Sequence, residues 1–296
     1  MRVGVLFLVL AMFLTPAADA VAKTMADDHS AMMIAFLRYL TAGLIAVALA
    51  RTTGRRIEIP RGDRAGLVLR TALIMGAMTA LIAALGMVPM AKAVGGFLIA
   101  PIVSGLLGVL IWGERPTAPR LLGSALSVAG AAALMRPEAG IEAGSLFALL
   151  GGALLGAYLS ATRGAGAATD PLSTLAVQCL LGAAMLAPFA LAGGAPRMTM
   201  ELAGSALALG AISAICHFLT VAAYQRAEAT TLAPFLYFNM ITAMAAGYFW
   251  FGETLSASAL IGLGGVAAGG IVTLMRFEAP RLALRLRPGA GRPGLA

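Results

Sequence analysis

The sequence predicts an all-α integral membrane protein in which ten transmembrane helices form two inverted five-helix repeats. Sixty per cent of the 296 residues are hydrophobic and 11% are charged, whereas soluble domains carry about 25% charged residues. The apolar residues gather in runs close to the roughly 20 residues that a spanning helix needs. The motif Trp112-Gly113-Glu114 returns as Phe251-Gly252-Glu253, in the same place relative to a long apolar run.

Short polar or Gly/Pro-containing breaks separate the apolar runs and predict the helix ends. The expected helices are 3–22, 31–50, 66–86, 93–112, 119–135, 145–163, 172–192, 201–222, 230–251 and 256–275. We expect a first repeat over 1–136, a second over 144–276, and a basic, disordered cytoplasmic tail over 277–296. Because the helices fill nearly the whole chain, no soluble catalytic domain fits, and we expect no enzyme.

The first run resembles a signal peptide, because Ala18-Asp19-Ala20 follows Met1-Arg2 and an apolar stretch. We expect it to be retained as a helix. Residues 3–22 occupy the place in the first repeat that 145–163 occupies in the second, and cleavage would leave one repeat incomplete.

The net charge of +8 does not indicate a nucleic-acid partner, because the basic residues follow the loops and form no patch interleaved with aromatics. Their excess on one side predicts that both termini are cytoplasmic. Fifteen fall on that side: Arg2, Arg51, Arg55, Arg56, Arg61, Arg64, Arg115, Arg120, Arg163, Arg226, Arg276, Arg281, Arg285, Arg287 and Arg292. Four fall on the other: Lys23, Lys92, Arg136 and Arg197.

Each repeat holds five helices, so the second must enter the membrane upside down relative to the first. Inverted repeats of this kind are typical of secondary transporters, which expose a central site to either side by exchanging the conformations of their halves. Glu114 and Glu253 then end helices at opposite faces, about 30 Å apart. We therefore expect a structural role for both, in the turns that follow, and not a shared proton.

Several residues give the chain a resemblance to a known family. They are the basic loop after 31–50, Arg38-Tyr39, Ala100-Pro101, and the Gly-Glu that ends 93–112 and 230–251. With the ten-helix length, they resemble the drug/metabolite transporter superfamily, EamA type, over roughly residues 3–275. The resemblance implies a carrier of small metabolites in a bacterial inner membrane. It implies a central cavity lined by the third, fourth, eighth and ninth helices and flanked by the first and sixth. The second repeat departs from the first at Met240, opposite Pro101, and at Gln178, opposite Arg38.

Helix breakers in corresponding segments of two repeats point to a transporter's binding site. Segment 93–112 contains Gly95, Gly96 and Pro101, and segment 230–251 contains Pro234. Proline frees a carbonyl one turn back, which cavity water or protein must satisfy. Asn239 and Tyr237 add an amide and a phenol near the second break. A simple packing kink is the alternative.

Ionisable and polar groups inside the membrane supply the remaining site candidates. Asp19 and Arg38 lie near the same end of neighbouring helices, and we expect them to pair, either as a structural tie or in substrate recognition or proton coupling. His217 lies near the centre of its helix and could carry a proton, although no carboxylate is near it in sequence. Tyr158 could offer a hydroxyl to a substrate. The GxxxG pairs Gly152/Gly156 and Gly265/Gly269 indicate close helix packing.

The expected function is a secondary carrier of a small organic metabolite such as an amino acid, vitamin or nucleoside-like cofactor. No ATP-binding loop, hydrolase motif or zinc spacing is present, so we expect no cofactor, no metal ion, and proton coupling or exchange as the driving force. The partners expected are the small-molecule substrate, protons and the lipid bilayer, with no obligate protein partner. A lipid translocator or a non-transporting membrane subunit is the alternative. An integral-membrane transferase would need several converging acids or histidines.

Overall fold

A computed structural model gives the fold of the chain. It describes residues 2–58, 63–113, 118–135, 142–162, 170–224, 226, 238–254 and 256–274. Within these ranges the protein is entirely helical, with the following helices: α1 (Arg2–Met25), α2 (Ala31–Thr52), α3 (Arg64–Leu85), α4 (Met90–Phe97), α5 (Ala100–Trp112), α6 (Ala118–Met135), α7 (Ala143–Thr162), α8 (Pro171–Ala190), α9 (Met200–Tyr224), α11 (Phe238–Phe251) and α12 (Ala257–Leu274).

Every expected run overlaps a described helix. Seven segments in the described part are long and apolar enough to cross a membrane, with α4 and α5 together forming one of them, and apolar stretches of α6 and α12 are shorter. The placement of Lys23 in a loop is wrong, because helix α1 continues to Met25 and Lys23 lies in its last turn. Segment 93–112 starts earlier, at Met90, and is divided in two at the break expected from Gly95, Gly96 and Pro101.

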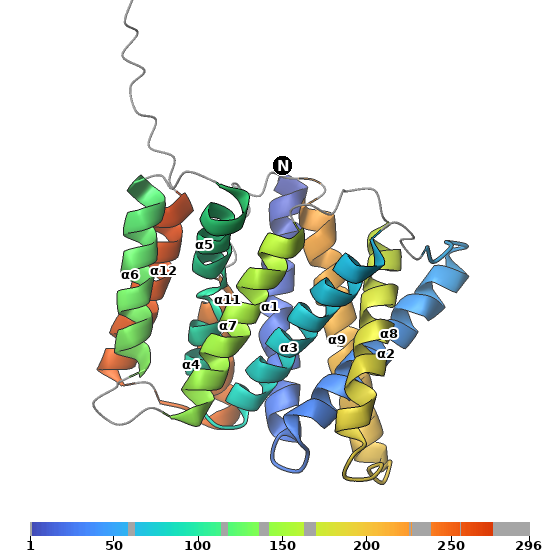
Figure 1. The fold of residues 1–296 in the computed structure, drawn as a ribbon. Coiled ribbons are helices and arrows are strands. Elements are labelled where there is room, and N and C mark those ends of the chain that lie inside the picture. Colours follow the sequence, from blue (N-terminus) through green and yellow to red (C-terminus); the bar gives the residue numbers. More distant parts are fainter. Residues whose placement is uncertain are drawn as a thin grey trace, which may run out of the picture.

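The two halves of the chain run in opposite directions. Helix α1 starts at the upper end of the bundle in Figure 1, whereas α7 starts at the lower end. Helix α12 ends at the same end where α1 begins. This is the arrangement that five helices per repeat requires.

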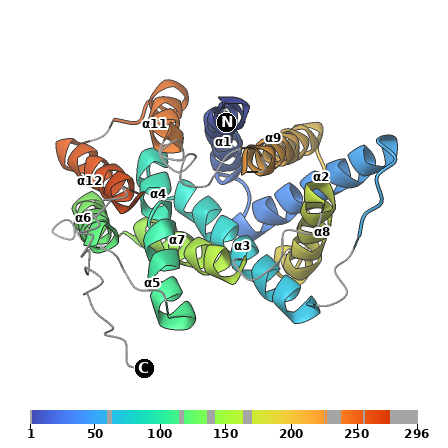
Figure 2. The ribbon, with the colours of Figure 1, turned by 90° about the horizontal axis from the view of Figure 1, so that it is seen from above.

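Helix packing repeats between the halves. Helices α2 and α8, which hold equivalent places in the two repeats, pack against each other, and so do α6 and α12. Helix α1 packs against α9 as its counterpart α7 packs against α3. Seen from above, α6, α12 and α5 form one end of the bundle and α2, α8 and α9 the other (Figure 2). The contacts therefore relate the halves by an approximate two-fold axis.

The backbone conformation explains why the repeated Gly-Glu motif contains glycine. Gly113 follows α5 with φ 64°, and Gly252 follows α11 with φ 62°. This left-handed conformation ends a helix and costs glycine nothing, because glycine has no Cβ. Helix starts are equally regular: the side chains of Ser30, Asp63 and Asp170 accept hydrogen bonds from the first-turn amides of α2, α3 and α8.

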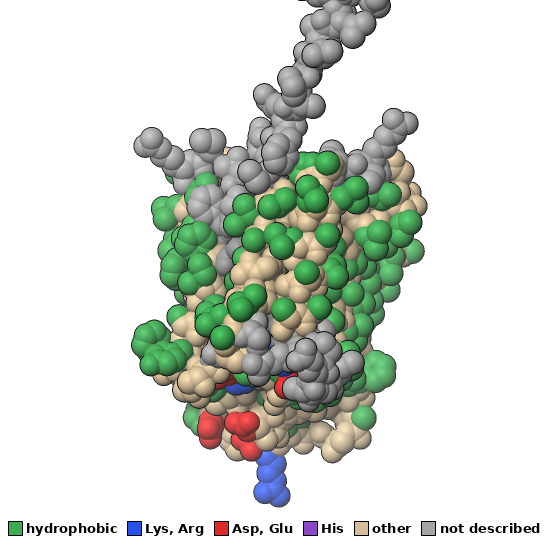
Figure 3. Space-filling view, turned by 90° about the vertical axis from the view of Figure 1, so that its left-hand side faces the viewer, with side chains coloured by type: hydrophobic (Ala, Val, Ile, Leu, Met, Phe, Trp, Pro, Cys, Tyr) green, Lys and Arg blue, Asp and Glu red, His purple; other side chains and the backbone are tan. Residues whose placement is uncertain are grey.

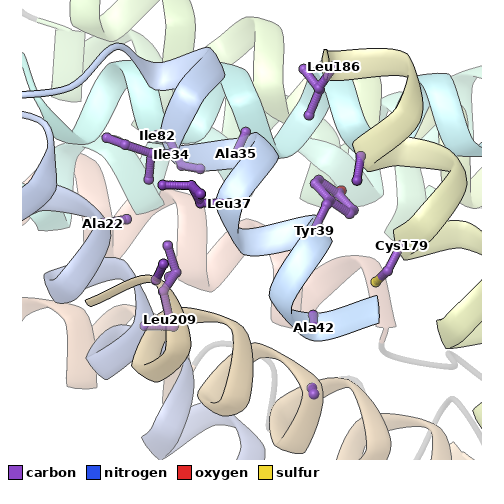
Figure 4. Packing of buried hydrophobic residues seen from close by; sticks show 14 of the residues in the cluster. Ala22, Ile34, Ala35, Leu37, Tyr39, Ala42, Ile82, Cys179, Leu186 and Leu209 are labelled. Carbon is purple, nitrogen blue, oxygen red and sulfur yellow. The ribbon is translucent and has the colours of Figure 1, made fainter. Parts of the chain in front are cut away.

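The largest buried apolar cluster lies between α1, α2, α8 and α9. It includes Ile34, Leu37 and Tyr39 from α2 and Leu209 from α9, all at most 8% exposed. Figure 4 shows these side chains filling the space between the helices, with Cys179 directed from α8 toward α2. This packing holds α2 in place and so fixes the position of Arg38, one residue before Tyr39.

The outside of the bundle is apolar, as lipid requires. Large side chains such as Leu110, Leu122, Phe249 and Ile261 are more than half exposed. Figure 3 views the α6 and α12 side, where hydrophobic side chains cover most of the described surface and the visible acidic and basic groups gather toward the lower end. An exposed surface of this composition suits a bilayer and not water.

Glycines allow the closest helix approaches. Gly152 and Gly156 of α7 face the division between α4 and α5: a Cβ on Gly152 would lie 2.8 Å from the carbonyl oxygens of Gly96 and Phe97, and one on Gly156 would lie 2.6 Å from the Ala100 oxygen. The GxxxG spacing thus brings α7 against the break. The glycine-lined face of α7 therefore packs directly against the residues where α4 ends and α5 begins.

Gly152→Ala should destabilise the protein by about 1 to 3 kcal/mol, because its methyl group would push against backbone atoms that cannot move aside. Gly105→Ala on α5 is the control, since a Cβ there meets nothing within 4 Å. The measurement is thermal unfolding of both variants in the same detergent. Equal melting temperatures for the two would contradict the close packing of α7 on the break.

Candidate functional site

A pair of opposite charges lies inside the bundle. Arg38 Nη1 of α2 is 3.8 Å from Asp19 Oδ1 of α1. The Asp19 side chain is 2% exposed and that of Arg38 is 14% exposed. Asp19 lies six residues before the end of α1 and Arg38 seven residues after the start of α2, so both are about 10 Å inside the lower end of the helices. The structure thus brings together the two residues expected to pair.

The pair is not closed by hydrogen bonds. Both carboxylate oxygens of Asp19 and Nη1 of Arg38 are buried, and none has a hydrogen-bond partner in the described part of the chain. A buried polar group without a partner costs about 1 to 3 kcal/mol, and more when it is charged. The two groups therefore attract each other across a gap while retaining unused hydrogen-bonding capacity.

Polar side chains of α2, α8 and α9 lie near this pair. Tyr39 and Cys179 lie within electrostatic reach of Arg38, and Cys216 of α9 within reach of both Arg38 and Asp19. The Cys216 thiol also contacts the carbonyl of Ala11 at 3.7 Å. The site thus lies between the first helices of one half and α8 and α9 of the other.

Tyr158 and Gln178 form a neutral counterpart of the charged pair in the second half. The side chains of Tyr158 in α7 and Gln178 in α8 lie near each other. Gln178 holds the place in its repeat that Arg38 holds in the first. The two repeats therefore differ in charge at these equivalent positions.

A second charged contact closes the lower end of the bundle. The Lys23 ammonium at the end of α1 donates to the carbonyl oxygens of Leu85 (2.7 Å) and Val88 (3.0 Å), and lies 3.1 Å from Glu253 Oε1. Glu253 Oε2 accepts a hydrogen bond of 2.8 Å from the Met90 amide, the first of α4. A carboxylate there complements the positive end of the helix dipole.

The expected role of Glu253, in the turn leading to the next helix, is therefore incomplete. Its side chain reaches across to the first half and joins α1, the α3–α4 turn and the start of α4. Lys23 follows Asp19 by four residues and lies on the same face of α1, one turn nearer the lower end. The contact therefore lies one helical turn from Asp19, toward the lower end.

The remaining candidates are not brought together. His217 of α9 is half-buried and has no hydrogen-bonding or charged partner among the described residues. Asn239 is the second residue of α11, and its buried side-chain oxygen has no partner in the described part. Helix α1 lies between α9 and α11 (Figure 2). A shared site for His217 and Asn239 stays a prediction.

The helix breakers are only partly described. Pro101 occupies the first turn of α5, directly after the division expected from Gly95, Gly96 and Pro101. Proline is well suited to that position because it lacks an amide that needs an acceptor. Pro234 and Tyr237 lie outside the described residues.

Arg70 is a buried charge that the sequence reasoning missed. It lies in α3 at 9% exposure, and its Nη1 is 2.9 Å from Asp63 Oδ2, two turns earlier. The pair could have been found, because Arg70 falls inside the expected helix 66–86 and Asp63 is seven residues before it. The Lys23–Glu253 contact could not be found from sequence spacing in this way, because its two residues are in different repeats.

Comparison with known proteins agrees with this architecture. The profile of the EamA-like transporter family matches residues 2–136 and again residues 142–275. A crystal structure titled only as that of a protein superposes with a TM-score of 0.64 at 16% sequence identity, over 91% of this chain and 96% of that chain, which shows a shared fold. No curated protein matches the sequence. Two consecutive family matches on an all-helical, lipid-compatible bundle place this multi-pass membrane protein in the EamA-like transporter family.

Proposed function

We propose that the protein is a secondary transporter that moves a small organic metabolite across the inner membrane by alternating access. The metabolite is of the amino acid, vitamin or nucleoside-like cofactor type, and proton coupling or exchange supplies the energy. Both termini are cytoplasmic, in accordance with the distribution of basic residues, and the doubled chain needs no protein partner.

The buried Asp19–Arg38 pair is the observation that carries the proposal. Two charges in the membrane interior are expensive and mark functional sites by default. This pair lies beside helices of both halves, which is where inverted-repeat carriers bind their substrates. If the pair only held α1 and α2 together, apolar side chains of similar volume would do so equally well.

The Lys23–Glu253 contact supports alternating access. It joins α1 and the α3–α4 turn of the first half to the end of α11 in the second. Rocking of one half against the other would separate these groups and open the lower end, which the basic-residue distribution assigns to the outside of the cell.

The proposal is tested by uptake into liposomes of the purified chain, with a panel of amino acids, flavins, nucleosides and vitamins, with and without a proton gradient. Saturable uptake of one class is expected, with at least tenfold less in Asp19→Asn. Asp27→Asn, which removes an exposed loop carboxylate, is the matched control and should keep uptake unchanged.

Several outcomes would redirect the proposal. Gradient-dependent uptake lost in His217→Ala would place proton coupling on α9, and gradient-independent uptake would indicate exchange. Absence of uptake for the whole panel, with scrambling of a fluorescent phospholipid in the same liposomes, would favour the lipid translocator. Absence of both would favour a non-transporting subunit.

A further inference from the structure

We infer that α1 is a hinged helix that bends at Pro16. The segment above the proline, 2–15, stays fixed to α9 and α11 of the second half. The segment below it, 17–25, moves with the first half and takes Lys23 away from Glu253. The inference rests on the proposed alternating access and assigns a hinge to it. It starts from a proline inside a membrane helix.

Pro16 leaves a carbonyl group of α1 without its helical donor. Proline has no amide hydrogen, so the Met12 oxygen, four residues earlier, loses its bond within the helix. The Thr242 hydroxyl of α11 donates to this oxygen at 2.9 Å. One residue earlier, the Ala11 oxygen lies 3.7 Å from the Cys216 thiol of α9. Side chains of the second half therefore satisfy the backbone at the break, as a proline in a membrane helix requires.

The segment above the proline is packed on the second half. Leu8 and Met12 belong to a buried cluster with Ala223 of α9. The ring centre of Phe13 lies 6.4 Å from that of Phe238, the first residue of α11. Helix α1 lies between α9 and α11 in the view from above (Figure 2). The upper segment is therefore held on both flanks by helices of one half.

Polar contacts with the first half begin below the proline. Asp19 lies 3.8 Å from Arg38 of α2. One turn further down, the Lys23 ammonium donates to the carbonyl oxygens of Leu85 and Val88, where α3 ends and turns into α4. The partners of α1 thus change at the point where its backbone is broken, and a bend there would let each segment follow its own partners.

The length of the lower segment decides what such a bend does. Lys23 lies seven residues beyond Pro16, or about 10 Å along the helix, and Asp19 three residues, or about 4.5 Å. A bend of about 20°, the size of a distinct proline kink, would move Lys23 by about 3 to 4 Å and Asp19 by about 1.5 Å relative to the upper segment. That movement is enough to break the Lys23–Glu253 contact of 3.1 Å. Asp19 would stay near Arg38, because both move with the first half.

Other helices show that the hinge is particular to α1. Helix α7, the counterpart of α1 in the second half, contains no proline. Pro188 also lies inside a helix, but it is two residues before the end of α8, where a bend displaces little. Pro16 is thus placed to move a long segment, and Pro188 provides a matched control for the same substitution.

The test measures a distance across the lower end by pulsed electron paramagnetic resonance, on the full chain in lipid nanodiscs. Spin labels are attached to cysteines replacing Asp28, in the exposed loop after α1, and Phe249 of α11, which is 79% exposed. The native Cys179 and Cys216 are buried, and labelling of the chain without the two new cysteines gives their background. We expect two distances, about 3 to 4 Å apart, in the doubly labelled protein.

Substitutions of the proline separate a hinge from a structural role. Pro16→Ala should leave one distance and reduce uptake at least tenfold, because alanine restores the amide donor and favours a continuous helix. Pro16→Gly restores the same amide but keeps the backbone pliable, so both distances should remain. Pro188→Ala should keep both distances and full uptake. A structural role of Pro16 would make the alanine and glycine variants differ in stability alone.

The outcomes distinguish the hinge from the carrier function. If Pro16→Ala keeps both distances, or if the protein with Pro16 shows a single distance, α1 does not hinge there, and saturable uptake would still establish the carrier. If both distances are seen and collapse to one in Pro16→Ala, while no solute of the panel is taken up, the hinge stands and the metabolite carrier fails.

Discussion

Gly130→Ala should lower the stability of the protein by about 3 kcal/mol, because it places a methyl group inside a close backbone contact between α6 and α12. A Cβ on Gly130 of α6 would overlap the Val266 amide and lie 2.7 Å from the Gly262 oxygen and the Gly265 carbonyl carbon of α12. All of these are backbone atoms, so no side chain can rotate away. The whole helix would have to move.

Helices α6 and α12 are also joined by Gly269 and Ser127. Gly269 of α12 lies against Ser127 and the Gly123 carbonyl, and Ser127 Oγ donates to the Val266 oxygen at 3.2 Å. In lipid, such close packing and interhelical hydrogen bonding replace the hydrophobic effect as the force between helices. The two helices end their respective repeats, so the contact also joins the halves.

Gly264→Ala is the matched control, since it lies on the same α12 helix and a Cβ there meets nothing within 4 Å. Alanine favours helix over glycine, so this variant should be unchanged or slightly more stable. Denaturation in a detergent titration measures the free energy of unfolding of both variants. A Gly130→Ala variant as stable as Gly264→Ala would show that α6 and α12 do not pack through their glycines.

The sequence predicted those features that are carried by local pattern. The apolar runs located the helices, GxxxG spacing located the faces that pack closely, and the Gly-Glu repeat located the ends of α5 and α11. Asp19 and Arg38 could be paired because a short turn joins α1 to α2, so equal depth implies proximity.

Features that depend on contacts between repeats could not be predicted. Glu253 was assigned to its own turn, because no sequence pattern shows that α1 and the start of α4 lie beside it. The likeness of Glu253 to Glu114 even concealed this contact, since a repeated residue suggests a repeated local role. Similarly, the sequence places His217 and Asn239 inside membrane helices, but it does not show that α1 lies between these helices, α9 and α11.

Lys23→Met should destabilise the protein by about 3 kcal/mol, because it leaves a half-buried carboxylate and two carbonyl oxygens without their cation. The side chains of Lys23 and Glu253 are 18% and 12% exposed. Methionine fills similar volume and keeps the apolar contact with Phe251, whose ring centre lies 5.5 Å from the ammonium. The loss therefore reports on charge and hydrogen bonding more than on packing.

A double-mutant cycle isolates the interaction between the two charges. Glu253→Gln alone leaves the ammonium bound only to carbonyl oxygens, while the double variant has no unpaired charge. The double variant should therefore be more stable than the sum of the two losses predicts, by about 1 to 3 kcal/mol. Lys92→Met is the control: its partner Glu142 is 53% exposed, and such pairs contribute less than about 1 kcal/mol. If Lys23→Met costs no more than Lys92→Met, or if the losses simply add, the Lys23–Glu253 contact does not hold the lower end closed. Contact between the halves at this end would then have to depend on the packing of α11 against α1 and α4.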